Sequence, residues 1–296
     1  MLVEVLGQTT EVVREVLYQV ELSPTEYFQR EYAKLGIPPY VWCDELEAFY
    51  RDTDVYLTMG VVWNRNPYKA MLREWIAAYI ARHCSGRQRI LTIGDGVGFD
   101  SLYLSQCEYE VTYSELSEKC LRFARQLFEL TSEPVHVLDN LNGIEAGGYD
   151  VVLCLDVLEH VPEPSELVEQ FARYLRLGGI LIVHAFFYYV SRANPTHLDS
   201  NRRYSGDIRN LYGKRGFSLG DGRLFLDPLV LVKGTSSTLK RPIWNMVLRT
   251  TGALFAVGRF WCTPHCFVAA QMVGKGDSHW LEGLSAERAP AEPSSN

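Results

Sequence analysis

The sequence predicts an α/β fold in which a mostly parallel β-sheet is covered by helices and preceded by a helical region. An apolar run at 90–93 leads into Gly94, Gly96 and Gly98 and then into a helical pattern, as at the end of a buried strand. Four further strand-like segments alternate with helical segments downstream, which is typical of strand–helix–strand units in a parallel sheet. The first 85 residues carry helix start signals instead of strand patterns.

The N-terminal region, residues 1–85, is expected to form a helical cap. Thr9 and Ser23 each precede an acid within three residues, as at the start of a helix, and Gly36–Pro39 interrupts the pattern. A longer helix at Tyr68–Arg82 then leads into the sheet.

Large aromatic side chains are concentrated in this cap. Most of them are expected to pack the helices against one another, because aromatic side chains bury large areas. Tyr50, Tyr56 and Trp63 are candidates for an apolar lid over a ligand site. The same surface could equally serve a contact between two copies of the chain, as in a homodimer.

The glycines after the first strand predict a close approach between backbone and ligand. Gly94, Gly96 and Gly98 can adopt backbone angles that other residues avoid, and they place no Cβ between the main chain and a ligand. Glycines at this spacing also occur in ordinary turns. About twenty residues after Gly94, however, a strand pattern at 109–114 ends at Glu115. In a doubly wound sheet such an acid accepts hydrogen bonds from both ribose hydroxyls of a nucleoside. Alternatively, Glu115 is an acid favoured by the positive end of the next helix.

The next three segments extend the parallel sheet. Val135–Asn140 is a short strand that closes on Asp139 and Asn140, two polar residues placed to meet the edge of an adenine base. Tyr149–Val161 contains a fourth strand and a turn, and Leu175–His184 contains a helix end, a Gly-Gly break and a fifth strand. These features are compatible with a dinucleotide-dependent dehydrogenase or with an S-adenosylmethionine (SAM)-dependent methyltransferase.

Five short motifs separate these two classes. In chain order they are Ile93–Gly98, Glu115–Ser117, Asp139–Asn140, Asp156–His160 and Leu177–Leu181. Together they resemble the class I SAM-dependent methyltransferases, especially the branch with a Leu-Glu-His turn that modifies small molecules. The resemblance covers about residues 88–220. It implies a Rossmann-like, seven-stranded, mostly parallel sheet whose last strand is antiparallel.

The resemblance also implies that SAM is the cofactor and S-adenosylhomocysteine (SAH) its product. The residues that would bind SAM lie at four places. They are Gly94, Asp95, Gly96 and Gly98 in the glycine turn after the first strand (the elbow), Glu115 and Leu116 at the ribose, Asp139 and Asn140 at the adenine, and Asp156 at the methionine end. The family usually has an acid two residues before the first glycine, where it helps to hold the amino group of the cofactor. Thr92 occupies that position here, and Asp95 could partly replace the acid.

Methyl transfer to a hydroxyl or an acidic carbon requires a base, and histidine is suited to this role because its ordinary pKa is near neutrality. His197, in the loop after the fifth strand, is the first candidate, with Tyr204 as its polar partner. His160 and His184 are the other candidates. Their structural alternatives are a loop cap for His197, a hydrogen bond that shapes the turn for His160, and a buried strand position for His184.

The core domain is expected to span residues 86–276. Phe217–Val232 should hold the sixth strand, residues 234–262 an insertion with a helix, and Phe267–Val273 an antiparallel edge strand. The tail at 277–296 is expected to be disordered, because it is rich in small and polar residues and in proline.

Composition limits the partners and the location. A chain of 296 residues with 47% hydrophobic residues can bury a full core, and its net charge of −7 argues against a nucleic acid partner. The first residues lack a signal peptide pattern, no stretch reaches the roughly 18 apolar residues of a membrane span, and the seven cysteines lack a secreted spacing. A reducing, cytoplasmic location is therefore expected. No metal site is expected, because the cluster at Trp261–Cys266 has no second half.

The chain is thus expected to be a SAM-dependent methyltransferase that modifies oxygen, nitrogen or carbon of a small, partly aromatic or apolar metabolite, as in natural product biosynthesis. Two alternatives remain open. The first is a SAM-binding protein with a binding or cyclisation role and no methyl transfer, for which Thr92 is the best hint. The second is a NAD-dependent oxidoreductase, which the Leu-Glu-His turn and the lack of a Tyr-x-x-x-Lys motif argue against.

Overall fold

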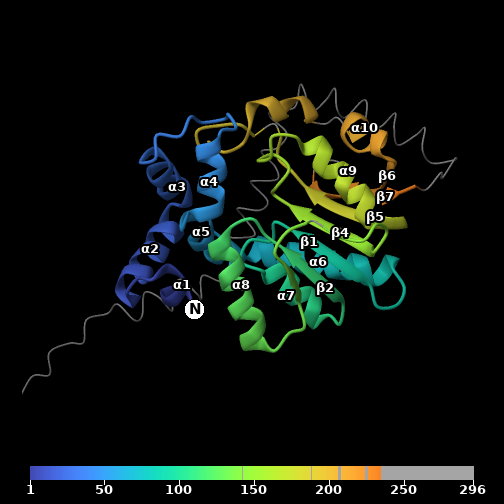
Figure 1. The fold of residues 1–296 in the computed structure, drawn as a ribbon, viewed down its shortest axis with the longest axis horizontal. Helices are drawn as coiled ribbons and strands as arrows, with labels where there is room; N and C mark the ends of the chain where they lie inside the picture. Colours follow the sequence, from blue (N-terminus) through green and yellow to red (C-terminus); the bar gives the residue numbers. More distant parts are fainter. Residues whose placement is uncertain (142, 188, 206–207, 224–225, 235–296) are drawn as a thin grey trace, which may run out of the picture.

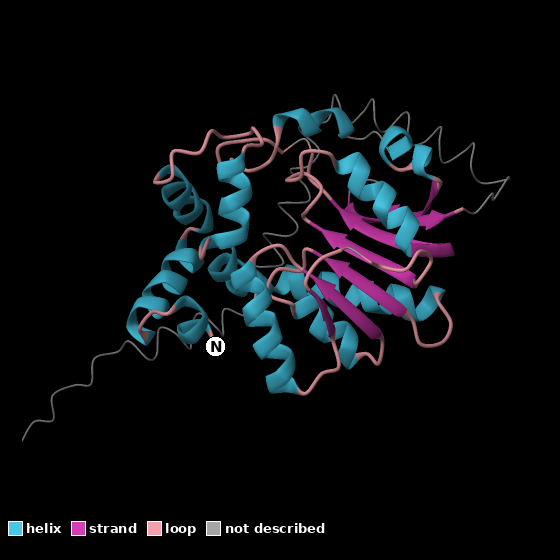
Figure 2. Ribbon diagram, in the orientation of Figure 1, coloured by secondary structure: helices cyan, strands magenta, loops and turns pink. Residues whose placement is uncertain are grey.

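The chain forms a seven-stranded sheet with helices around it (Figures 1 and 2). The computed structural model describes residues 1–141, 143–187, 189–205, 208–223 and 226–234. The strands are β1 (Arg89–Ile93), β2 (Glu110–Ser114), β3 (His136–Leu138), β4 (Tyr149–Leu155), β5 (Leu175–His184), β6 (Phe217–Arg223) and β7 (Leu226–Lys233). The α-helices between and after them are α7 (Phe99–Gln106), α8 (Glu118–Thr131), α9 (Pro164–Tyr174) and α10 (Ile208–Leu211), and the short 3-10 helices are η1 (Asp199–Tyr204) and η2 (Gly213–Arg215).

The strands lie in the order β3-β2-β1-β4-β5-β7-β6. Strands β1 to β5 pair in parallel, whereas β7 is antiparallel to both β5 and β6. The predicted seven-stranded, mostly parallel sheet with an antiparallel last strand is confirmed. Because β1 lies between β2 and β4, the order of the strands reverses at this point. Ligands of open α/β sheets bind outside the carboxyl ends of the strands at such a reversal.

Two local expectations were wrong. Residues 217–232 contain two strands, β6 and β7, where one was expected. Helix α9 ends at Tyr174, and Gly178 and Gly179 lie inside β5, where the register with β4 shifts. A Cβ on Gly179 would lie 3.0 Å from the carbonyl oxygens of Arg176 and Asp150, so this irregular stretch has little room for a larger residue. The Gly-Gly pair therefore forms a bulge within β5, and the preceding helix has already ended at Tyr174.

The remaining expectations concern the C-terminal residues. The insertion at 234–262, the strand at 267–273 and the tail at 277–296 lie outside the described residues, apart from Gly234 itself. In the part of the chain that the structure describes, none of the helices combines the length and the apolar character that a membrane span needs.

The sheet is buried on both faces. Successive strand residues point to opposite faces. On one face, Phe171 of α9 and Leu211 of α10 belong to the same buried cluster as the inward-facing side chains of β1, β4 and β5. On the other face, Ile76, Ile80 and Leu104 pack against the alternate residues of these strands. This packing holds the carboxyl ends of β1 and β4 rigidly in place.

Six helices precede β1. They are α1 (Leu2–Leu6), α2 (Thr10–Leu22), α3 (Pro24–Ala33), α4 (Asp44–Asp52), α5 (Val55–Asn64) and α6 (Pro67–His83). The Thr9 hydroxyl accepts the amide of Val12 at the start of α2, and α3 begins with Pro24 directly after Ser23. Helices α2 to α5 enclose a core of their own, with Phe28, Leu46 and Phe49 among its members. They lie on the side toward which the parallel strands point (Figures 1 and 2).

The elbow between β1 and α7 requires glycine at both ends. Gly94 has a φ of +71° and Gly98 a φ of +82°, in the left-handed region. A Cβ on Gly94 would lie 2.3 Å from Val157, and one on Gly98 would lie 2.8 Å from Phe128 and 2.9 Å from Ala124. Close packing of the elbow against α8 and the turn after β4 thus depends on the missing side chains.

We expect Gly98→Ala to lower the free energy of unfolding by about 2–5 kcal/mol, as measured by urea denaturation. A left-handed backbone costs a non-glycine residue roughly 1–2 kcal/mol, and overpacking adds about 1–3 kcal/mol. Gly7→Ala is the matched control, since Gly7 has a φ of +62° but no atom within 4 Å of the place its Cβ would take. Equal losses in the two variants would contradict the packing requirement at Gly98.

Candidate functional site

The ends of β1 and β2 meet in a network of backbone amides. Glu115, directly after β2, accepts hydrogen bonds from the amides of Gly96 (2.8 Å), Leu116 (2.8 Å) and Ser117 (2.9 Å). Burial raises the pKa of Glu115, although these three N–H groups act in the opposite direction. Gly96 has a φ of +59°, and no atom of the described residues lies within 4 Å of the place a Cβ would take. The elbow is therefore open at Gly96, whose amide donates to Glu115.

Exposed residues continue this edge of the sheet. Leu116 is 56% exposed, which leaves an apolar side chain next to Glu115 uncovered. Asp139 and Asn140 follow β3 and are exposed, and Asp139 forms an ion pair with Arg125 of α8 at 2.6 Å. Because parallel neighbours end at the same edge, β3 carries these two polar residues to the side of the sheet that holds Glu115.

Asp95, within the elbow, is directed toward α7. Its carboxylate accepts the amides of Asp100 (3.2 Å) and Ser101 (2.7 Å) and the hydroxyl of Ser101 (2.6 Å). Burial and the neighbouring Asp100 raise the pKa of Asp95 to about 7. The Thr92 hydroxyl lies 2.7 Å from the same Ser101 hydroxyl and 3.3 Å from the carbonyl oxygen of Thr112. Asp95 and Thr92 thus anchor the start of α7.

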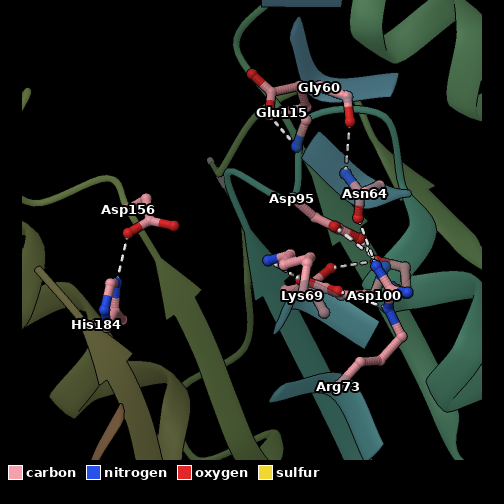
Figure 3. Close-up of polar contacts among 12 residues, drawn as sticks. Gly60, Asn64, Lys69, Arg73, Asp95, Asp100, Glu115, Asp156 and His184 are labelled. Atoms are coloured by element: carbon pink, nitrogen blue, oxygen red, sulfur yellow. Dashed lines mark hydrogen bonds and ion pairs between the residues drawn. The ribbon is translucent and has the colours of Figure 1, made fainter. Parts of the chain in front are cut away.

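Asp100, in the first turn of α7, is the centre of a buried cation cluster formed by Lys69, Arg73 and Asp100. Lys69 donates to one carboxylate oxygen and Arg73 to the other, each at 2.8 Å. Arg73 also donates to Asn64, whose amide donates to the carbonyl of Gly60 at 2.9 Å. Burial opposes the ionised form of Asp100, but Lys69 and Arg73 lower its pKa, and Asp100 in turn raises the pKa of Lys69 against the effect of burial. The cluster joins α5 and α6 of the cap to the elbow (Figure 3).

Asp156 follows β4 in an uncommon backbone conformation, with a φ of +58°. Its amide donates to the carbonyl of His184 at 2.9 Å, and its carboxylate is bonded to Nδ1 of the same histidine. Burial acts against the charge on Asp156, but His184 and then Lys69 lower its pKa to about 2. The Asp156 side chain is 39% exposed and the His184 side chain only 4%. His184 therefore supports Asp156 from behind, and Asp156 faces the open edge of the sheet.

His160 ends the Leu-Glu-His turn and contacts the cap. Its Nδ1 lies 2.8 Å from the hydroxyl of Tyr50 in α4 and 3.3 Å from the carbonyl oxygen of Thr196. The Tyr50 hydroxyl donates to the same carbonyl at 3.3 Å, and Tyr56 of α5 donates to the hydroxyl of Thr196 at 3.3 Å. The rings of Tyr50 and Tyr56 stack with centroids 5.1 Å apart. With His197, whose ring meets that of His160 edge to face at 4.6 Å, these side chains form the histidine–tyrosine cluster.

The contacts of His160 fit two tautomers, because the Tyr50 hydroxyl can donate to Nδ1 or accept from it. A carbonyl oxygen can only accept, so a hydrogen bond to Thr196 requires the tautomer with the proton on Nδ1 and a lone pair on Nε2. Within the described residues Nε2 has no hydrogen-bond partner, and it is not among the fully buried polar atoms that lack one. Burial lowers the pKa of His160 to about 4. His160 is thus a neutral imidazole whose Nε2 is accessible.

Glu159 and His197 are more deeply buried than His160. The Glu159 carboxylate accepts the amide of Phe186 at 3.2 Å, while its second oxygen and Nδ1 of His197 have no hydrogen-bond partner among the described residues. Burial and Asp156 raise the pKa of Glu159 to about 8, and burial and His160 lower that of His197 to about 3. Glu159, His160 and His197 each place one potential metal-ligand atom within 4.8 Å of the others.

The sequence-predicted site residues fall into two groups. The first group lies along one edge of the sheet and consists of Gly94, Asp95, Gly96, Gly98, Glu115, Leu116, Asp139, Asn140, Asp156, His184 and His160, joined by His197 from the following loop. Tyr204 does not join them. Its ring packs against Phe187 and Arg203, and among the described residues its hydroxyl does not bond to His197. Tyr50 of the cap takes the place beside the histidines that was expected for Tyr204.

The sequence-based reasoning missed the cation cluster. Lys69 and Arg73 are four residues apart and so share one face of the helix that leads into the sheet. Asp100, two residues after the last elbow glycine, is an acid at the start of a helix, which has an ordinary explanation in the helix dipole. The sequence feature that could have predicted the cluster is the pair of cations on α6, the helix that must pack near Asp100.

Comparisons with known proteins agree with this arrangement. Residues 91–183 match the family model described as a methyltransferase domain. The ubiquinone biosynthesis O-methyltransferase of Bordetella avium (strain 197N) is 36% identical over 113 residues, which is 36% of this chain and 45% of that protein. The protein of the same name from Caulobacter sp. (strain K31) is 33% identical over 129 residues, 40% of this chain and 51% of that protein. The chain spans about half the length of these curated relatives.

Solved structures of methyltransferases also match. Magnesium protoporphyrin IX methyltransferase (ChlM) from Synechocystis PCC 6803, solved with bound SAM, is 23% identical, with a TM-score of 0.42 over 60% of this chain and 81% of that chain.

We expect Asp100→Asn to lower the free energy of unfolding by about 3–5 kcal/mol, because Lys69 and Arg73 would remain buried without their shared anion. Glu110→Gln is the control. It breaks the exposed Arg89–Glu110 pair and should cost less than about 1 kcal/mol. Denaturant unfolding of the two variants measures both values. A loss below about 1 kcal/mol for Asp100→Asn would show that the buried cations do not need this carboxylate.

Proposed function

We propose that the chain, of which residues 91–183 match a methyltransferase domain, transfers the methyl group of SAM to a hydroxyl of a small, partly aromatic molecule. The observation that carries this proposal is the position of His160. Its accessible Nε2 lies at the edge of the sheet that also holds the glycine elbow and Glu115, and the aromatic side chains of the cap enclose it. The O-methyltransferase names of the relatives support an oxygen atom as the methyl acceptor.

The residues at the elbow fit the nucleoside half of SAM. Gly96 leaves its backbone uncovered, and Glu115 beside it accepts three amide N–H groups and keeps one lone pair for a ribose hydroxyl. The exposed Leu116 offers an apolar surface to the adenine ring, and Asp139 and Asn140 offer polar groups to its edge. Bound SAM would supply a methyl group on a positively charged sulfur. We assign Asp156, which is ionised and faces the open edge, to the methionine end.

The cap supplies the acceptor side. Tyr50 and Tyr56 stack on each other beside His160, and Trp42 stacks on Tyr50 with centroids 6.2 Å apart. Such a surface favours a flat apolar ring over a charged group. Trp63, the third aromatic residue expected in the lid, is 43% exposed on α5. The lid that we propose therefore rests on Tyr50 and Tyr56.

The proton of the acceptor hydroxyl would pass to Nε2 of His160. Burial keeps His160 neutral, so Nε2 can accept a proton across the neutral pH range. Tyr50 and the Thr196 carbonyl hold the proton on Nδ1 and thereby keep the lone pair on Nε2. With its proton held on Nε2, the acceptor oxygen would be free to bond to the methyl group that bound SAM would supply, and SAH would be the leaving group. The enclosing cap would exclude water and hold the two reactants together.

We expect Glu115→Ala to raise the dissociation constant for SAH at least tenfold in a calorimetric titration. The substitution removes a hydrogen bond to a charged group, which is worth about 1.5–3 kcal/mol. Glu110→Ala, on the same strand but away from the elbow, is the control and should leave the constant unchanged. If Glu115→Ala bound SAH as well as the parent protein does, Glu115 would not bind the ribose.

We expect His160→Gln to lower kcat about 10²- to 10⁴-fold with catechol or a related phenol as acceptor, while SAH affinity stays within twofold. Tyr50→Phe should lower kcat less, because the Thr196 carbonyl still holds the proton on Nδ1. In the parent protein, kcat/KM should stay constant from pH 7 down to pH 5, because His160 gains its proton only near its lowered pKa of about 4. An acidic limb near pH 6.5 would contradict the assignment. Binding of SAH without any methylated product would instead favour the non-methylating alternative.

A further inference from the structure

We propose that Asn201 is a positioning residue that selects the tautomer of His160, the one with its proton on Nδ1 and a lone pair on Nε2. This inference rests on the proposed function, in which that lone pair receives the proton of the methyl acceptor. Asn201 lies in the 3-10 helix η1, 40 residues after Val161, and none of the five sequence motifs contains it.

The side-chain amide of Asn201 binds the whole Leu-Glu-His turn. Its Nδ2 donates to three backbone carbonyl oxygens of the turn. The distances are 3.4 Å to Leu158, 3.2 Å to Glu159 and 2.8 Å to Val161. Carbonyl oxygens only accept, so these contacts fix the orientation of the amide. Asn201 is fully buried, and it therefore holds the backbone on both sides of His160 away from solvent.

The same region of the chain places the hydrogen-bond acceptor for Nδ1. The amide of Leu198 donates to the Glu159 carbonyl at 3.1 Å, so the loop is bonded to the turn beside the Asn201 contacts. Thr196, two residues earlier, brings its carbonyl oxygen to 3.3 Å from Nδ1 of His160. Asn201 thus sets both the turn that carries the ring and the distance of the loop from the ring.

The other end of the Asn201 amide is unfavourable for stability. Its Oδ1 is buried and has no hydrogen-bond partner among the described residues. A buried acceptor without a partner costs free energy, which a side chain chosen for packing alone would avoid. Folded proteins accept such local costs chiefly at functional sites. The amide is therefore retained for what its N–H groups hold, which is the turn.

The contact with Thr196 decides between the two tautomers. The Tyr50 hydroxyl can donate to Nδ1 or accept from it, so it is compatible with both. The Thr196 carbonyl can only accept, so it favours the proton on Nδ1. If the turn and the loop separated, this preference would be lost and part of the molecules would carry the proton on Nε2. Those molecules could not receive the proton of the acceptor.

Nitrogen-15 NMR of the histidine-labelled whole chain tests the inference at neutral pH without any ligand, because protonated and bare ring nitrogens differ widely in chemical shift. We expect His160, assigned by the signals missing from His160→Gln, to have a protonated Nδ1 and a bare Nε2. Asn201→Leu, which keeps the branched shape without polar atoms, should contain both tautomers. A bare Nδ1 in the parent protein, or the same tautomer in parent and variant, would overturn the inference.

Kinetics connect the tautomer with turnover. Asn201→Leu should lower kcat roughly 10- to 100-fold, less than loss of the base itself, while SAH affinity stays within about twofold. Ile80→Ala is the control, because it opens a cavity on the other face of the sheet and leaves the turn untouched. It should change neither the tautomer nor kcat. An equal fall in kcat in both variants would mean that Asn201 acts only through stability, and would overturn the inference.

The inference and the proposed function can fail separately. Normal turnover by Asn201→Leu would overturn the inference and leave the proposed function standing. A parent protein that transfers no methyl group, with a tautomer that still depends on Asn201, would overturn the proposed function and support the selection of the tautomer. Asn201→Ser keeps one donor and should give intermediate values of kcat and of the tautomer ratio, which covers a failure of Asn201→Leu to fold.

Discussion

The buried carboxylate of Asp100 is the interaction on which the site depends. It is bonded through both oxygens, to Lys69 and to Arg73, and it lies in the first turn of the helix that leaves the elbow. The cap helix α6 and the elbow are thereby joined by charge in the protein interior, where a lost partner is costly. Arg73 extends the connection to Asn64 at the end of α5. The helix that carries Tyr56 is thus tied to the same point as the glycine elbow.

The cap is tied to the sheet a second time, through the loop after β5. The amide of Tyr40 donates to the carbonyl of Pro195 at 2.7 Å, and the amide of Asp199 donates to the carbonyl of Tyr40 at 2.9 Å. Leu198 is buried in the core of the cap itself. His197 and Thr196 lie between these anchors, so the loop reaches His160 together with the cap. The histidine–tyrosine cluster can form only when both are in place.

The parts of the site that the sequence predicted are those with a local cause. The elbow, Glu115 and Asp156 follow from strand ends in a parallel sheet, where position along the chain determines position in space. The cation cluster and the partner of the histidines could not be predicted in this way. Lys69 and Asp100 are 31 residues apart, and Tyr50 and His160 are 110 residues apart. Tyr204 lies closer in sequence to His197, but its short helix turns the ring toward Phe187.

The site contains a charged lysine and two neutral histidines, and their different hydrogen-bond partners explain the difference in charge. Lys69 remains a cation although it is buried, because Asp100 raises its pKa more than burial lowers it. In the described part of the chain no carboxylate is hydrogen-bonded to His160 or His197, and burial lowers the pKa of both. The methyl transfer that we propose would benefit from neutral histidines, because a positive charge on the acceptor side would hinder the approach of the sulfonium and lower the basicity of the nucleophile.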